Sequence, residues 1–154
     1  MNACVEFLGK LLDKLSIKRR VEISDFYLAG PMRGYDDLNA PMFRLVSHLM
    51  REKGFTVWNP SEHGSYIKTS FAECMKEDLN AIINGCRNIA MLPGWRDSLG
   101  ANIEACAAFA CGKDAFEVVM WDNGASFDLA PVDLTKYVLP YISVDCNGFD
   151  PHNE

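Results

Sequence analysis

Glu104 is a carboxylate in an apolar stretch of the sequence. It belongs to the segment WRDSLGANIEACAAFACGK, residues 95–113, whose second half consists mostly of small and apolar side chains. Burying an ionised carboxylate is costly unless another group pairs with it or a reaction uses it. We expect a helix to begin near Gly100 or Ala101, which places Glu104 in the first turn, where the helix dipole favours the ionised form. The alternative is a capping glutamate, which would need Ser, Thr, Asp or Asn three residues earlier, where the chain has Ala101.

Asp78 is a second acidic residue of interest. In the segment EDLNAI, residues 77–82, it directly precedes Leu79, which is an expected inward position of a helix. Asp78 would therefore flank the buried face of that helix. The alternative is an ordinary position on a solvated helix face.

A glycine-containing turn follows the first expected strand, in the segment YLAGPMRG, residues 27–34. Gly30 and Gly34 suit a backbone that approaches a ligand closely, and Arg33 would point into the same crevice. Many loops between strands and helices carry glycines, so this segment alone is a weak indication.

Strands and helices are expected to alternate along the chain. Short apolar runs predict strands at 25–30, 55–58, 88–92 and 116–121. Helices are expected after Pro41, after a capping box formed by Ser70 and Glu73, with Ile82 and Ile83 among its inward residues, and at 101–111. The tail from Asp122 is harder to place, and KYVLPYISV, residues 136–144, could give a fifth strand or a docking segment.

This alternation predicts right-handed βαβ units and a mainly parallel sheet of four or five strands. In such sheets ligands bind beyond the carboxyl ends of the strands. Four segments would meet at that edge: GPMRGY, NPSEHG, PGWRDSLG and the loop after VVMW.

Composition narrows the class of partner. The chain has 154 residues, with 49% hydrophobic and 23% charged side chains, a net charge of -6 and an isoelectric point near 5.0. An acidic surface does not favour nucleic-acid polymers or anionic membranes, whereas one local pocket can still bind a small phosphorylated ligand. The six cysteines form no C-x-x-C pair and have no histidine at ligand spacing, so no metal site is expected. With no signal peptide or transmembrane run visible, we expect a reduced, cytoplasmic protein.

Together, YLAGPMRG, EDLNAI and SLGANIEACAAFACGK resemble the nucleoside 2-deoxyribosyltransferase superfamily, and more narrowly its 2'-deoxynucleoside 5'-monophosphate N-hydrolases. They also resemble a group of phage-associated small proteins with LAGPMRG and LPGW signatures. The resemblance covers about residues 25–121 and depends on the order and spacing of the motifs. It implies a flavodoxin-like or Rossmann-like three-layer α/β sandwich. We expect residues 1–24 to be an amphipathic helical extension and residues 25–154 to form the domain.

The resemblance also implies roles for individual residues. Glu104 would be the nucleophile, Tyr27 would hydrogen-bond its carboxylate, and Asp78 would be the second catalytic carboxylate. Positions that match the phosphate-binding residues of the N-hydrolases are Gly30, Arg33, Ser98 and Gly100. Relatives that act on free nucleosides tend to have an aspartate where Ser98 stands, so the serine favours nucleotides. Pro31 departs from the pattern, since it replaces a small hydroxyl residue common in the N-hydrolases.

The implied chemistry is cleavage of an N-glycosidic bond, which passes through an oxocarbenium-like transition state. Glu104 could stabilise that charge and form a covalent intermediate, and Asp78 could protonate the leaving base if its pKa is raised. Water would complete a hydrolysis, which is the expected activity. A second base would give deoxyribosyl transfer, and a non-catalytic nucleotide sensor is the other alternative. No cofactor is expected.

Aromatic residues at the crevice have two interpretations each. Trp58 and Trp95 could stack on a base or belong to the core or a dimer contact, and His63 lies in a loop that could reach the base edge. Trp58 and its neighbour Asn59 are expected to bind the substrate. The amphipathic segment 3–16 has no obvious partner within one domain, so we expect a homodimer or higher homo-oligomer.

Overall fold

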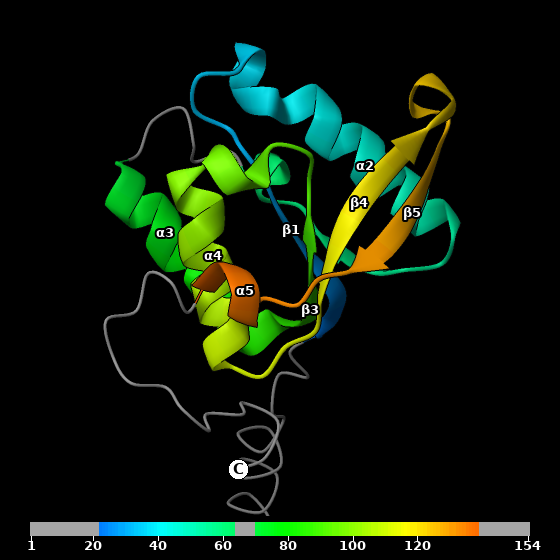
Figure 1. The fold of residues 1–154 in the computed structure, drawn as a ribbon. Coiled ribbons are helices and arrows are strands. Elements are labelled where there is room, and N and C mark those ends of the chain that lie inside the picture. The colour runs from blue at the N-terminus through cyan, green and yellow to red at the C-terminus, as the bar shows by residue number, and fades with distance from the viewer. Residues whose placement is uncertain (1–21, 64–69, 139–154) are drawn as a thin grey trace, which may run out of the picture.

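A five-stranded sheet with the strand order β2-β1-β3-β4-β5 forms the centre of the protein. The computed structural model describes residues 22–63 and 70–138. The strands are β1 (Ser24–Ala29), β2 (Val57–Trp58), β3 (Cys86–Met91), β4 (Ala115–Trp121) and β5 (Ser126–Pro131). The first four strands run parallel, and β5 runs antiparallel to β4 (Figure 1). The prediction of an α/β fold with a mainly parallel sheet is therefore confirmed.

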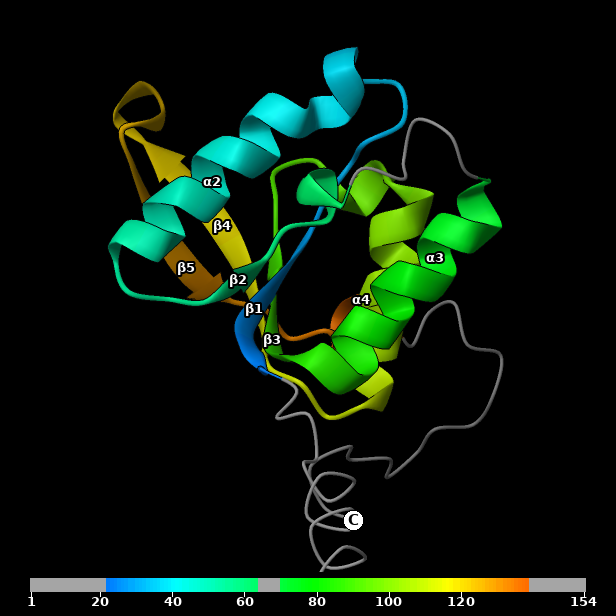
Figure 2. The ribbon, with the colours of Figure 1, turned by 180° about the vertical axis from the view of Figure 1, so that it is seen from behind.

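Helices cover both faces of this sheet and give the flavodoxin-like three-layer arrangement. Helix α2 (Ala40–Glu52) lies on one face, and helices α3 (Phe71–Asn80) and α4 (Leu99–Ala110) lie on the other, as two opposite views show (Figure 1, Figure 2). The short helix α5 (Thr135–Val138) packs on α4.

The helix boundaries follow local signals in the sequence. Pro41 stands at the start of α2, where its missing N–H costs no intrahelical bond. The capping box predicted for α3 is present, because the Ser70 side chain accepts from the Glu73 N–H and the Glu73 carboxylate accepts from the Ser70 N–H. Both signals fix where a helix begins without help from tertiary contacts.

Alternate residues of β1 supply the two halves of the core, because successive side chains of a strand point to opposite faces. Phe26 and Leu28 pack with Val46 of α2 on one side. Tyr27 belongs to the cluster on the other side, which includes Ala105 of α4. The strand thus directs the tyrosine towards α3 and α4.

The fifth strand of the sheet precedes KYVLPYISV, the segment for which the sequence left open a strand or a docking role. It lies at Ser126–Pro131 and pairs with β4 through the tight turn Asp122–Gly124, whereas Thr135–Val138 is helical and residues 139–144 lie outside the described part. The missed signal is the Asp-Asn-Gly turn, in which Asn123 and Gly124 adopt positive φ angles of 54° and 93° and reverse the chain. A Cβ on Gly124 would lie 3.4 Å from Leu45 of α2, so this turn sits over the α2 face and does not join the predicted crevice.

The end of helix α3 also differs from the prediction. After Asn80 the helix continues as a π-helical turn, Ala81–Gly85, in which the hydrogen-bond spacing widens. The wider turn changes the angular phase of the side chains, so Ile82 is buried but Ile83 is 48% exposed.

The predicted N-terminal extension, residues 1–24, lies outside the described residues except for its last positions, and Ser24 already belongs to β1. In the described ranges, none of the helices has the length and apolar character needed to cross a bilayer.

Candidate active site

A buried hydrogen bond joins the central strand to helix α4. The Tyr27 Oη donates to the Glu104 Oε1 over 2.8 Å, although the two residues are 77 positions apart in the sequence. Tyr27 is fully buried and Glu104 is 5% exposed. The contact predicted between these two side chains is present, and the carboxylate is neither a surface group nor a helix cap.

Helix α4 can bring Glu104 to the sheet because its buried face is built from small residues. Ala101, Ala105 and Ala108 are almost completely buried, so the helix backbone lies close to the strands. The helix begins with Ser98, whose Oγ accepts from the Ala101 N–H at 3.3 Å. Glu104 is therefore the sixth residue of the helix and lies in its second turn, not in the first turn as predicted.

This position changes the expected charge state of Glu104. The field of a helix terminus falls off within the first turn, so the helix dipole does little for a carboxylate in the second turn. Complete burial raises the pKa of Glu104 well above its ordinary value of 4.5, the nearby charge of Asp78 raises it further, and only the Tyr27 hydrogen bond lowers it. Burial and the charge of Asp78 therefore oppose the ionised form of Glu104, which the helix dipole was expected to favour.

Asp78 is the second carboxylate of the site. It comes from helix α3, is 2% exposed, and lies near enough to Glu104 for its charge to act there. The alternative of a solvated helix face is therefore excluded. Helices α3 and α4 run side by side in both views and carry one carboxylate each to their shared interface (Figure 1, Figure 2). Two buried carboxylates whose charges act on one another disfavour double ionisation.

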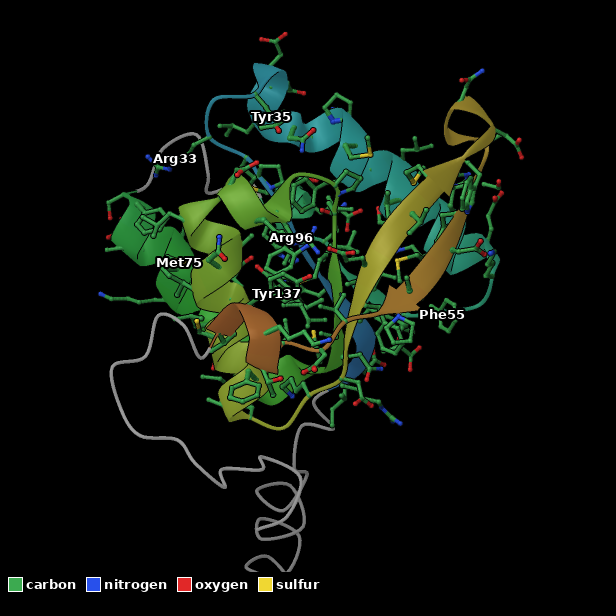
Figure 3. All side chains as sticks on the ribbon, viewed as in Figure 1. Arg33, Tyr35, Phe55, Met75, Arg96 and Tyr137 are labelled. Atoms are coloured by element: carbon green, nitrogen blue, oxygen red, sulfur yellow. The ribbon has the colours of Figure 1, made fainter. Side chains whose placement is uncertain are left out.

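A second group of predicted residues gathers around Phe71, the first residue of α3. The Arg33 guanidinium lies over the Phe71 ring, 5.1 Å from its centroid, at the start of α3 (Figure 3). A Cβ on Gly100 would lie 3.7 Å from the same ring and 4.0 Å from the Ser98 Oγ. Arg33 of the first loop and Gly100 at the start of α4 thus both lie near Phe71, and Ser98 caps the helix beside Gly100. The sequence analysis did not identify this position of Phe71.

Packing and backbone conformation explain why Gly30 and Gly34 are glycines. A Cβ on Gly30 would lie 2.8 Å from the Leu92 Cβ, too close for any side chain, while the Leu92 N–H donates to the Ala29 carbonyl at 2.7 Å. Gly34 has a φ of +85°, and a Cβ there would meet nothing within 4 Å. The close backbone approach at Gly30 is therefore to the loop after β3, and Gly34 serves the turn that carries Arg33.

Two residues predicted near the substrate belong to the protein interior. Trp95 is 2% exposed, and its indole N–H donates to the Glu117 Oε1 at 2.8 Å, so stacking of Trp95 on a base is excluded. Asn59 is completely buried, with its amide donating to the Ser47 Oγ at 3.0 Å and its carbonyl accepting from the Ser61 N–H at 3.0 Å. Asn59 follows β2, and its side-chain amide is hydrogen-bonded within the protein and so is not available to a substrate. Trp58, by contrast, lies on the site's face of the sheet.

A polar network that the sequence analysis missed fixes the loop carrying Ser98. The Asn102 amide donates to the Ser98 carbonyl at 2.7 Å and to the Arg96 carbonyl at 2.9 Å. Arg96 pairs with Glu117 at 2.6 Å and donates to the Tyr137 Oη at 2.9 Å (Figure 3). Asn102 follows the serine closely enough to indicate a cap, but nothing in the sequence links Arg96 to Tyr137.

The described residues contain no group of three or more His, Cys, Asp or Glu side chains that could hold a metal ion.

Fold and site define a class of protein: a flavodoxin-like α/β domain with a tyrosine-bound pair of buried carboxylates between two helices. Residues 24–117 match the family model described as a domain of unknown function, DUF4406, and the chain belongs to this family. The matched range runs from β1 into β4 and includes Tyr27, Asp78 and Glu104. Comparisons with curated proteins and with solved structures give no match. The family description names no activity, so function is argued from the site.

The raised pKa of Glu104 predicts an unusual dependence of stability on pH. The unfolded chain loses this proton above a pH near 4.5, whereas the folded protein keeps it. The free energy of unfolding should therefore fall as pH rises between the two pKa values, by up to about 1.4 kcal/mol per pH unit. Glu104→Gln lacks this titration but keeps an acceptor for Tyr27. Urea unfolding should show similar stability for both proteins below about pH 5 and a growing advantage for the variant towards about pH 8.

Glu52→Gln is the matched control, because Glu52 lies on the exposed side of α2 with a side chain that is 61% exposed. Its stability relative to the unmodified protein should change little over the same range. A difference between Glu104→Gln and the unmodified protein that stays constant with pH would contradict the raised pKa.

Proposed function

We propose that this protein hydrolyses the N-glycosidic bond of 2'-deoxynucleoside 5'-monophosphates, with Glu104 as the nucleophile. The observation that carries the proposal is the buried Tyr27–Glu104 hydrogen bond beside the second carboxylate, Asp78. Paired carboxylates in different environments are the usual means of glycosidic bond cleavage, because one attacks while the other donates a proton. A site that only bound a ligand would have no use for this costly arrangement. The resemblance of the three motifs to the N-hydrolases supports the same substrate class.

This mechanism needs one ionised carboxylate and one protonated carboxylate. Glu104 must be ionised to attack the anomeric carbon, and the Tyr27 hydroxyl stabilises the ionised form by donating to it. Donation of this kind moves the shared proton towards Asp78. Glu104 then forms a bond to the anomeric carbon as the bond to the base breaks, and Asp78 gives its proton to the departing base. Water then attacks the anomeric carbon and gives a proton to Asp78, while the bond to Glu104 breaks and deoxyribose 5-phosphate is released.

The residues around Phe71 support recognition of a 5'-phosphate. Arg33 offers a guanidinium for charge-assisted hydrogen bonds, and its contact with the Phe71 ring limits its conformations. The Ser98 Oγ accepts from the helix backbone, which leaves its hydroxyl proton for a second partner. Near Gly100 the first backbone N–H groups of α4 are available at the positive end of a helix of 12 residues. A carboxylate at position 98, by contrast, would repel a phosphate.

Deoxyribosyl transfer between bases is the second candidate, since the same intermediate reacts with a base as well as with water. A panel of deoxynucleosides and 5'-monophosphates, incubated with and without an added base, separates the two activities. Free base without an acceptor indicates hydrolysis, and new nucleoside only with an acceptor indicates transfer. In either case we place the activity on small nucleotides of the cytoplasm and not on nucleic-acid polymers.

Glu104→Gln should abolish base release while leaving nucleotide affinity within about threefold, since removing a nucleophile typically costs about 10^3-fold or more in rate. Chromatography of the free base and calorimetric titration of the nucleotide measure the two effects. Glu52→Gln should retain full activity. Near-normal turnover by Glu104→Gln would return this carboxylate to a structural role.

A deoxynucleoside 5'-monophosphate should exceed its nucleoside by at least about 30-fold in kcat/KM, because a charge-assisted phosphate contact is worth roughly 2–5 kcal/mol. Arg33→Ala should remove most of that preference by lowering kcat/KM for the nucleotide while leaving kcat/KM for the nucleoside unchanged. Ser98→Asp should lower it further, although aspartate keeps the helix cap. Arg44→Ala, which loses only the exposed pair with Asp37, is the matched control. Equal constants for nucleotide and nucleoside in the unmodified protein would favour the transferase.

We further propose that the protein works as a homodimer or larger homo-oligomer. Leu99 is 70% exposed although it lies between Ser98 and Gly100, and Tyr35 in the first loop is 50% exposed. Apolar side chains at the rim of a site are suited to contact a second copy. Light scattering at micromolar concentration should give at least twice the chain mass of 17.2 kDa. A monomer would contradict the proposal.

A further inference from the structure

In the described part of the structure, one indole N–H is left without a hydrogen bond. The chain has three tryptophans. The Trp95 N–H donates to Glu117 and the Trp121 N–H donates to Asp128, both at 2.8 Å. The Trp58 Nε1 is buried and has no partner in the part of the chain that the structure describes. Buried donors without a partner are rare in folded proteins, and each calls for an explanation.

Trp58 lies on the same face of the sheet as the catalytic pair. In the parallel register between β1 and β2, Trp58 stands directly opposite Tyr27. Paired residues of neighbouring strands project to the same face, and Trp58 packs against the core cluster that contains Tyr27. The unpaired donor therefore belongs to the strand next to the one that holds Glu104 in place.

The face of the indole is partly taken by another ring. The imidazole of His63 stacks on Trp58 with ring centroids 3.9 Å apart and planes at 10°. A base cannot stack on the face of Trp58 that His63 covers. Stacking on a base is therefore not the role that we assign to Trp58. The indole edge, where the N–H lies, is the polar feature that a ligand can use. Because this edge is shielded from water, the indole or the His63 ring must shift when a ligand atom approaches.

We propose that the Trp58 N–H donates a hydrogen bond to the leaving base and stabilises the charge that develops there during bond cleavage. This inference rests on the proposed hydrolase or transferase function. When the bond between the anomeric carbon and the base nitrogen breaks, its electron pair passes to the base. The charge spreads onto the acceptor next to that nitrogen, which is O2 of a pyrimidine or N3 of a purine.

An indole is a donor only, so Trp58 keeps its proton and the base receives one from Asp78. A hydrogen-bond donor that meets developing charge is worth more in a site shielded from water than in solvent. Trp58 would thus select bases with an acceptor beside the glycosidic nitrogen, and it would share the activation of the leaving group with Asp78.

The test compares leaving groups of different quality. Trp58→Phe removes the donor and keeps an aromatic ring, and Trp121→Phe is the matched control because it removes an exposed indole at the end of β4. The substrates are the 5'-monophosphates of deoxyguanosine and 7-methyldeoxyguanosine, or of deoxyuridine and 5-fluorodeoxyuridine, according to the base class that the unmodified protein cleaves. In each pair the base of the second substrate is the better leaving group, so the charge that develops on it needs less stabilisation by the protein.

Trp58→Phe should lower kcat by roughly 10- to 100-fold for the poorer leaving group and by clearly less for the better one. Trp121→Phe should behave like the unmodified protein with both substrates. An equal loss with both leaving groups would assign Trp58 a packing role and overturn the inference. If Trp58→Phe does not fold, replacement of the indole by the isosteric benzothiophene side chain removes the N–H without changing the shape.

A second measurement observes the donor directly. In Glu104→Gln, which binds without turnover, the three indole N–H signals are assigned by the Trp58→Phe and Trp121→Phe changes. Saturation with the same 5'-monophosphate should shift the Trp58 signal downfield and slow its exchange with water, while the other two stay in place. An unmoved Trp58 signal would overturn the inference. Failure of the proposed function itself looks different, since the unmodified protein would then release no base from any substrate.

Discussion

The hydrogen bond between Tyr27 and Glu104 is the interaction on which the site depends. It links the central strand β1 to helix α4 and joins residues 77 positions apart. A hydroxyl from the middle of a sheet can reach a helical carboxylate only if the helix lies very close to the strands. The alanines of α4 allow this approach, and larger side chains at their positions would hold the two groups apart. The packing of small residues is therefore what places the carboxylate.

Keeping Glu104 in this position costs stability, because burial and the neighbouring charge of Asp78 both disfavour its ionised form. Proteins tolerate such arrangements mainly where the perturbed group is used. In the proposed mechanism the two carboxylates have different tasks, since one proton shared between them leaves one carboxylate and one acid. The Tyr27 donor breaks the symmetry between them.

The rest of the site consists of loops that rigid contacts hold in place. The turn after β1 is fixed because Gly30 packs against Leu92, and the loop after β3 is fixed by Asn102 and by the Arg96–Glu117 pair. Together they bring Arg33 and Ser98 towards Phe71 from different parts of the chain. Polar contacts thus hold the two loops, and Trp58, stacked on His63, lies beside the strand that carries Tyr27.

The sequence by itself determined the features that depend on local chemistry. Alternating apolar runs predicted the order of four strands and three helices, the capping box predicted where α3 begins, and an isolated acid in an apolar run pointed to Glu104. Only the tertiary structure decided which tryptophan is interior and which faces the site. It also decided that the fifth strand is antiparallel and that burial and the charge of Asp78 raise the pKa of Glu104. These properties depend on burial and on contacts between distant segments, and a single sequence records neither the distance between two side chains nor the water excluded around them.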